Sequence, residues 1–123
     1  MTTTVIIIVG MFFFGMGVYA LAAPAALARP FRIVIDSAES RSEIRAVYGG
    51  FGLAIAAVLA AAALDIGDIR TGAVITVAAA LAGMALGRLF SRIADKATAF
   101  YPIWWYFWIE TIGAALLFGV ARP

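Results

Sequence analysis

Four apolar segments separated by short polar stretches make up nearly the whole chain. They cover about 5–28, 42–64, 71–90 and 101–120. An α-helix needs about 20 predominantly apolar residues to cross the hydrocarbon core of a bilayer, and each segment has about that length. The pattern therefore predicts an all-α integral membrane protein, a bundle of four transmembrane helices that forms a single domain over residues 1–123.

Polar residues mark the connections between these helices. The run from Asp36 to Arg41 combines hydroxyl and acidic side chains that favour the start of a helix. Residues 65–68 form a short turn, and another polar stretch covers 91–98. Pro24 and Pro30 bracket the end of the first segment, where we expect the helix to bend or stop.

The first segment also has one feature of a cleavable signal peptide. Ala20-Leu21-Ala22 resembles a small-residue cleavage site, but residues 1–4 carry none of the cationic side chains that precede such peptides. We therefore expect a retained transmembrane helix.

The composition agrees with membrane insertion and restricts the chemistry. Hydrophobic residues make up 65% of the chain and charged residues 13%, whereas soluble domains have about 25% charged residues. Cysteine and histidine are absent, which excludes disulfides, thiolate nucleophiles, imidazole bases and the commonest ligands of zinc and haem. We expect no metal or cofactor, apart from a bound lipid or small hydrophobic ligand.

The distribution of the cationic residues predicts the orientation. Seven lie on the side of the first and third connections, and only Arg70 and Arg122 lie on the other side. The positive-inside rule then places these two connections in the cytoplasm and both chain ends outside it, in a bacterial inner membrane. This topology explains the net charge of +2, so we expect no nucleic-acid partner. The seven are Arg29, Arg32, Arg41, Arg45, Arg88, Arg92 and Lys96.

Glu110 is the most unusual residue of the apolar segments. It lies about nine positions into the last segment, which places it near the bilayer centre. An ionised carboxylate there costs at least about 2 to 3 kcal/mol unless it is paired or protonated. Glu110 therefore indicates either a functional site or an internal ion pair.

Arg88, Arg45 and Tyr48 are the candidate partners of Glu110. Arg88 lies a few residues inside the cytoplasmic end of the third helix, and its long side chain can extend inward. Arg45 and Tyr48 share a face of the second helix. In a functional interpretation, the four residues form one buried polar site open to the cytoplasm, suited to an anionic headgroup, a proton or a polar solute. We favour the other interpretation, a structural network, because membrane bundles use internal ion pairs and hydrogen bonds to hold helices together.

Small residues predict where helices pack closely. Gly49, Gly52 and Ala56 share the helix face of Arg45 and Tyr48, and Gly83 and Gly87 repeat the four-residue spacing of Gly52 and Ala56 on the third helix. Glycines at such spacings let two helix backbones approach. We therefore expect both pairs to lie at helix–helix contacts.

Charged residues predict ion pairs at the cytoplasmic helix ends. Glu43 lies close to two arginines, and Asp95 lies between Arg92 and Lys96. Such exposed pairs contribute little to stability. The acidic residues lack the spacing of metal ligands, so we predict no metal site.

Trp104, Trp105 and Trp108 gather with Tyr106 at the start of the last segment. Amphipathic rings settle at the depth of the lipid headgroups, so an aromatic belt explains them. A stacking platform for a ligand is the alternative.

Two runs of sequence resemble a known family. The runs SAESRSEIRAVYGGFG at 37–52 and GMALGRLFS at 83–91, together with the last-segment glutamate, resemble the bacterial four-helix membrane family named domain of unknown function 4345. The resemblance covers nearly the whole chain and implies a four-helix inner-membrane protein without an assigned activity. The tryptophans of the last segment depart from the family pattern. That pattern includes Glu43, Arg45, Tyr48, Gly49, Gly50, Arg88, Asp95 and Glu110.

Three classes of function are compatible with these observations. We favour a non-enzymatic accessory or scaffold subunit of a larger membrane complex, or a protein that binds a lipid or small ligand at the buried polar site. The second class is a homo-oligomeric, proton-coupled transporter that uses Glu110, although small multidrug antiporters carry their glutamate in the first helix. The third is an enzyme acting on a lipid or quinone, with Glu110 as acid or base and Arg88 or Arg45 holding an anion.

Overall fold

The computed structural model describes residues 1–121, and this part of the chain is helical with no strand. Within it, four continuous helical stretches are long and apolar enough to cross a membrane. They are Thr2–Ala22, Ala38–Ala63, Arg70–Ala94 and Phe100–Val120. Arg122, one of the two cations expected on the side of the chain ends, lies outside the described residues.

The first stretch is α1 (Thr2–Ala22), and it ends earlier than the sequence pattern predicts. Pro24 disfavours helical backbone at the residue before it, and Ala23 has φ −142° and ψ 65°. A short helix, α2 (Pro24–Ala28), starts at the proline and leads into the 3-10 turn η1 (Arg29–Phe31). The predicted first helix is therefore two helices that meet at a break.

The second stretch begins at Ala38 because Ser37 and Ser40 cap its first turn reciprocally. The Ser40 amide donates to Ser37 Oγ at 3.0 Å, and the Ser37 amide donates to Ser40 Oγ at 3.1 Å. This cap starts the helix before residue 42, where the apolar pattern begins. The stretch consists of α3 (Ala38–Ile44), the π-helical turn η2 (Arg45–Gly50) and α4 (Phe51–Ala63).

A tight turn connects α4 to the third stretch. Asp65, Gly67 and Asp68 all have left-handed backbone, with φ of 56°, 70° and 53°, a region in which glycine and aspartate are favoured. The turn contains η3 (Ile66–Asp68) and leads into α5 (Arg70–Ala94). The fourth stretch consists of a π-helical turn, η4 (Phe100–Trp104), and α6 (Trp105–Val120).

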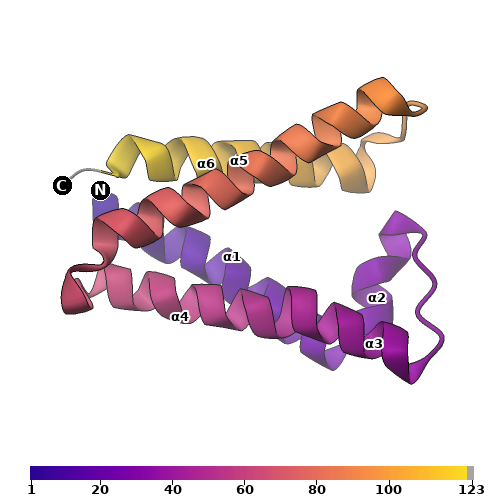
Figure 1. Cartoon of the computed structure of the whole chain (residues 1–123), viewed down its shortest axis with the longest axis horizontal. Helices are drawn as coiled ribbons and strands as arrows, with labels where there is room; N and C mark the ends of the chain where they lie inside the picture. Colours follow the sequence, from indigo (N-terminus) through magenta and orange to yellow (C-terminus); the bar gives the residue numbers. More distant parts are fainter. Residues whose placement is uncertain (122–123) are drawn as a thin grey trace.

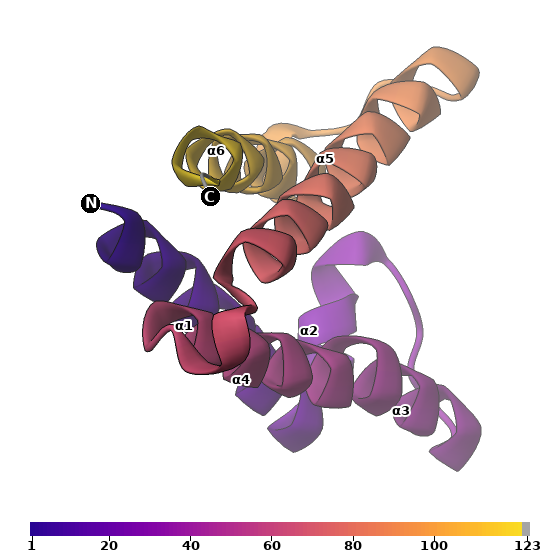
Figure 2. The same cartoon turned by 60° about the vertical axis from the view of Figure 1, so that its left-hand side comes forward.

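The helices form two layers. α1 packs against α4, α5 packs against α6, and smaller contacts join α4 to α5 and α1 to α6. The layers meet at the end where α4 turns into α5 and diverge toward the other end (Figures 1 and 2). The connection through η1 and the connection from α5 to η4 both lie at the diverging end (Figure 1).

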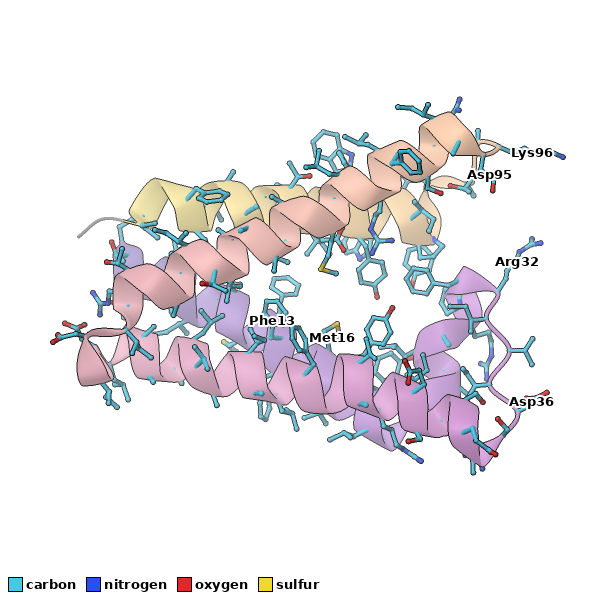
Figure 3. The ribbon with its side chains drawn as sticks, in the orientation of Figure 1. Phe13, Met16, Arg32, Asp36, Asp95 and Lys96 are labelled. Carbon is cyan, nitrogen blue, oxygen red and sulfur yellow. The ribbon has the colours of Figure 1, made fainter. Side chains whose placement is uncertain are left out.

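One hydrophobic core joins the four long stretches at the converging end. Phe13 and Met16 of α1 point into the space between the layers (Figure 3). A smaller cluster around Ala20, Leu27 and Ile44 fixes α2 against the start of the second stretch. The main core consists of Val5, Ile6, Val9, Phe13, Leu59, Ala62, Val74, Val77, Ala78, Leu81, Ala114 and Leu117.

Candidate functional site

Glu110 lies on the inner face of α6. It shares this face with Ala114 and Leu117, and all three side chains are buried. Only 3% of Glu110 is exposed. A carboxylate removed from solvent to this degree requires a partner.

Arg88 of α5 is that partner. Its Nε donates to Glu110 Oε1 and its Nη2 donates to Glu110 Oε2, each at 2.8 Å. The planar guanidinium thus matches the two carboxylate oxygens in a bidentate pair, the strongest form of such a contact. The Arg88 side chain is 20% exposed.

Two aromatic rings cover the ion pair. The Arg88 guanidinium carbon lies 5.7 Å from the centroid of the Tyr106 ring and 6.0 Å from that of Phe31. These rings also contact each other, with centroids 5.4 Å apart. Because Phe31 belongs to η1, the connection after α2 reaches across the bundle and closes over the pair. Phe31 lies in the polar connection and gives no periodic signal, so its role could not be predicted from the sequence.

This arrangement limits what Glu110 can do chemically. Both carboxylate oxygens already accept a hydrogen bond from a cation, and the residue is shielded from solvent. Each oxygen keeps a second lone pair, but a general base must also lie within reach of a substrate proton, and burial of Glu110 restricts that access. The geometry is that of an internal ion pair between two helices.

Arg45 does not belong to this site, contrary to the prediction of a four-residue cluster. Its side chain is exposed, and its Nε donates to the carbonyl oxygen of Leu21 at 3.1 Å. The last carbonyls of a helix lack partners within the helix, and the cation satisfies one at the end of α1. The π-helical turn that begins at Arg45 also changes the angular spacing on which the shared face was predicted.

Tyr48, the fourth residue of the predicted cluster, packs beside α2. It is half-buried and packs against the small cluster of Ala20, Leu27 and Ile44. Both hydrogen bonds of the ion pair join Arg88 to Glu110, and Tyr48 takes part in neither.

The ion pairs predicted at the helix ends are not formed. In residues 1–121 the only ion pair joins Arg88 to Glu110. Glu43 is two positions from each neighbouring arginine, and side chains at that spacing do not face each other on a helix. Asp95 has left the helix, with φ −138° and ψ −177°, so it no longer shares a face with Arg92, and its Oδ1 accepts the amide of Lys96 at 2.8 Å.

Gly49 and Gly52 lie where α1 crosses the second stretch, as predicted. A Cβ on Gly52 would lie 3.0 Å from the carbonyl oxygen of Phe13, and one on Gly49 would lie 2.8 Å from Leu21 Cδ2. Their counterpart is Gly17 of α1, which sequence reasoning missed: a Cβ there would lie 2.9 Å from the Gly49 carbonyl oxygen. The three glycines interlock, so the two backbones approach closely.

The prediction for Gly83 and Gly87 is wrong. A Cβ on either residue would meet nothing within 4 Å. The face of α5 that packs on the other helices instead carries Val74, Val77, Ala78, Leu81 and Ala85. The same small-residue spacing therefore marks a helix contact on one stretch and open space on another.

The aromatic residues at the start of the fourth stretch point in different directions. Trp105 and Trp108 are exposed, whereas Trp104 is half-buried and packs edge-on against Phe107, with centroids 5.2 Å apart. Tyr106 faces inward to Arg88. Within the described part of the chain, no three acidic side chains gather into a possible metal site.

Comparison with known proteins identifies a family and no individual relative. A family model described as domain of unknown function (DUF4345) matches residues 1–121. This confirms the family resemblance seen in the two sequence runs. No curated protein and no solved structure gives a significant match.

Proposed function

The chain belongs to the DUF4345 family, and we propose that it is a multi-pass integral membrane protein without catalytic activity of its own. In this proposal it binds a lipid or a small amphiphilic ligand, alone or as an accessory subunit of a larger membrane complex. The observation that carries the proposal is the closed Arg88–Glu110 pair.

Exposed apolar side chains support insertion in a membrane. Each long stretch carries a large aromatic residue with about half or more of its surface exposed. A protein that exposed such side chains to water would be prone to aggregate. Lipid tails solvate such side chains. The four examples are Phe14, Phe51, Phe90 and Phe118, with exposures of 59%, 52%, 70% and 49%.

The positions of the connections support the proposed orientation. The two cation-rich connections lie at one end of the bundle, and α1 begins at the opposite end, where α6 also ends (Figure 1). With seven cations at the first end, the positive-inside rule places the diverging end in the cytoplasm. In a bacterium the membrane would be the inner membrane.

The ion pair supports a structural rather than a catalytic or proton-carrying role for Glu110. A carboxylate that exchanges protons must lose its cationic partner during the cycle. Here two charge-assisted hydrogen bonds and two aromatic rings hold that partner in place. The pair therefore fixes α5 against α6 at the end where the layers diverge.

The proposal is tested by mild extraction from the native membrane into lipid nanodiscs, with mass spectrometry of everything that remains bound. A lipid or protein retained in stoichiometric amount by the wild type supports a binding or accessory role. A homo-oligomer with nothing bound, together with proton-coupled uptake that Glu110→Gln abolishes, would contradict it and favour transport. Glu43→Gln, which removes an exposed carboxylate, is the control variant.

A further inference from the structure

A pocket of about 370 Å³ lies between the last turns of α5 and the start of the fourth stretch. Its polar wall is formed by Arg88, Arg92 and Ser91 of α5 and by Thr98 of the connection, and Lys96 borders it. Arg88 is neutralised by Glu110. Within residues 1–121, Arg92 and Lys96 have no ion-pair partner, so the pocket has uncompensated positive charge at its outer end.

The rest of the pocket lining is apolar. Met84 and Ile103 form it together with Trp104, whose ring is held by its edge-on contact with Phe107. Gly87 also lines the pocket, and a Cβ there would meet nothing within 4 Å. The surface of α5 is therefore open at Gly87, and an apolar chain can lie against the helix there.

The order of these residues along α5 matches the depth profile of a phospholipid. Met84 lies two helical turns deeper than Arg92, because each turn contains about 3.6 residues. Lys96 follows the end of the helix, and its side chain extends beyond the end of the bundle (Figure 3). In a bundle that spans the membrane, Arg92 and Lys96 therefore lie at the depth of the lipid headgroups, and the apolar lining lies at the depth of the acyl chains.

We propose that this pocket binds the phosphate group of an anionic phospholipid, with an acyl chain along Met84 and Gly87. Arg92 is the principal phosphate ligand, Ser91 and Thr98 donate hydrogen bonds, and Lys96 adds charge at the rim. Basic pockets between transmembrane helices on the cytoplasmic side recognise anionic headgroups in this way. The inference rests on the proposed membrane insertion, but it assigns a site distinct from the buried Glu110 carboxylate.

Native mass spectrometry of the delipidated protein, titrated with phosphatidylglycerol, tests the inference. We expect one tightly bound phosphatidylglycerol in the wild type and in Arg41→Gln, which removes a cation outside the pocket. Arg92→Gln should weaken binding about tenfold, the loss of one charge-assisted hydrogen bond. Gly87→Leu should also weaken it, because the side chain fills the path of the acyl chain.

Two outcomes would overturn the inference. The first is equal phosphatidylglycerol binding by the wild type and Arg92→Gln. The second is full displacement of the lipid from the wild type by inorganic phosphate, combined with phosphatidylglycerol binding that is equal in the wild type and Gly87→Leu. Free phosphate would then be the ligand. Circular dichroism verifies that each variant is folded. The two proposals can also fail separately. If Arg92→Gln binds phosphatidylglycerol as well as the wild type does, but native extraction still yields a bound lipid or protein, this site is wrong and the proposed function is still supported.

Discussion

The guanidinium of Arg88 and the carboxylate of Glu110 join α5 to α6 through two parallel hydrogen bonds of 2.8 Å. Glu110 is 3% exposed, and in the described part of the chain its ion-pair partner is Arg88. Removal of one partner from a buried ion pair leaves an uncompensated charge, whereas replacement of both by apolar residues of similar volume is often neutral. The pair therefore behaves as a unit.

Substitution of one member of the pair should destabilise the bundle strongly. We expect Arg88→Ala to lower the free energy of unfolding by about 3 to 5 kcal/mol, because Glu110 is left buried and unpaired. Unfolding by increasing fractions of denaturing detergent in mixed micelles measures the change. Arg45→Ala is the matched control: it removes an exposed arginine with one hydrogen bond to Leu21, and its cost should be about 1 kcal/mol. Equal losses for the two variants would contradict the special role of the pair.

The contact between α1 and the second stretch should depend on Gly17. A Cβ at this position would lie 2.9 Å from the Gly49 carbonyl oxygen and from the Leu53 amide nitrogen, and backbone atoms cannot move aside as a flexible side chain can. Gly17→Ala should therefore cost about 1 to 3 kcal/mol by overpacking. Gly83→Ala should be neutral or stabilising by up to about 1 kcal/mol, because its Cβ meets open space on a helix. The same detergent unfolding measures both variants. If Gly83→Ala lowers the free energy of unfolding more than Gly17→Ala does, the close contact between α1 and the second stretch at Gly17 would be refuted.

Cysteine labelling should verify the membrane orientation, since the chain contains no cysteine of its own. Val34→Cys and Ala97→Cys place a thiol in the cation-rich connections, and Ile66→Cys places one in the turn at the other end. In intact cells with a permeabilised outer membrane, a membrane-impermeant maleimide should label Ile66→Cys only. In inverted vesicles it should label the other two. Labelling of all three from one side would show that the chain does not span the membrane as proposed.

The sequence predicted the helical stretches because apolar length is a strong signal. It also predicted the Arg88–Glu110 contact, since a buried glutamate in an apolar helix requires a cation and Arg88 lies at a reachable depth. Two helix ends differ from the approximate bounds of the apolar segments, at places where the sequence indicated a bend and a helix start. Pro24 breaks the first stretch at Ala23, and the Ser37–Ser40 cap starts the second before its apolar part begins.

The remaining errors have a common cause, which is that spacing along one helix does not reveal what the neighbouring helix offers. Arg45 was assigned to the ion pair, but the unpaired Leu21 carbonyl at the end of α1 binds it instead. Gly83 and Gly52 belong to the same kind of small-residue pattern, yet only Gly52 faces another backbone. Phe31 covers Arg88 because the connection after α2 brings it there. The path of such a connection cannot be predicted from hydrophobic periodicity.

The central claim, that Arg88 and Glu110 hold the helices together and do not carry the function, is tested most directly on the double variant Arg88→Met with Glu110→Leu. The measurement is mass spectrometry of what remains bound after native extraction, with stability verified by detergent unfolding. We expect the double variant to unfold close to the wild type and to retain the same lipid or partner, because apolar packing replaces the ion pair. Because Arg88 also lines the proposed phospholipid pocket, the comparison includes Arg92→Gln. A double variant that is equally stable but has lost a bound species that Arg92→Gln retains would contradict the claim, since the ion pair would then contact the ligand itself.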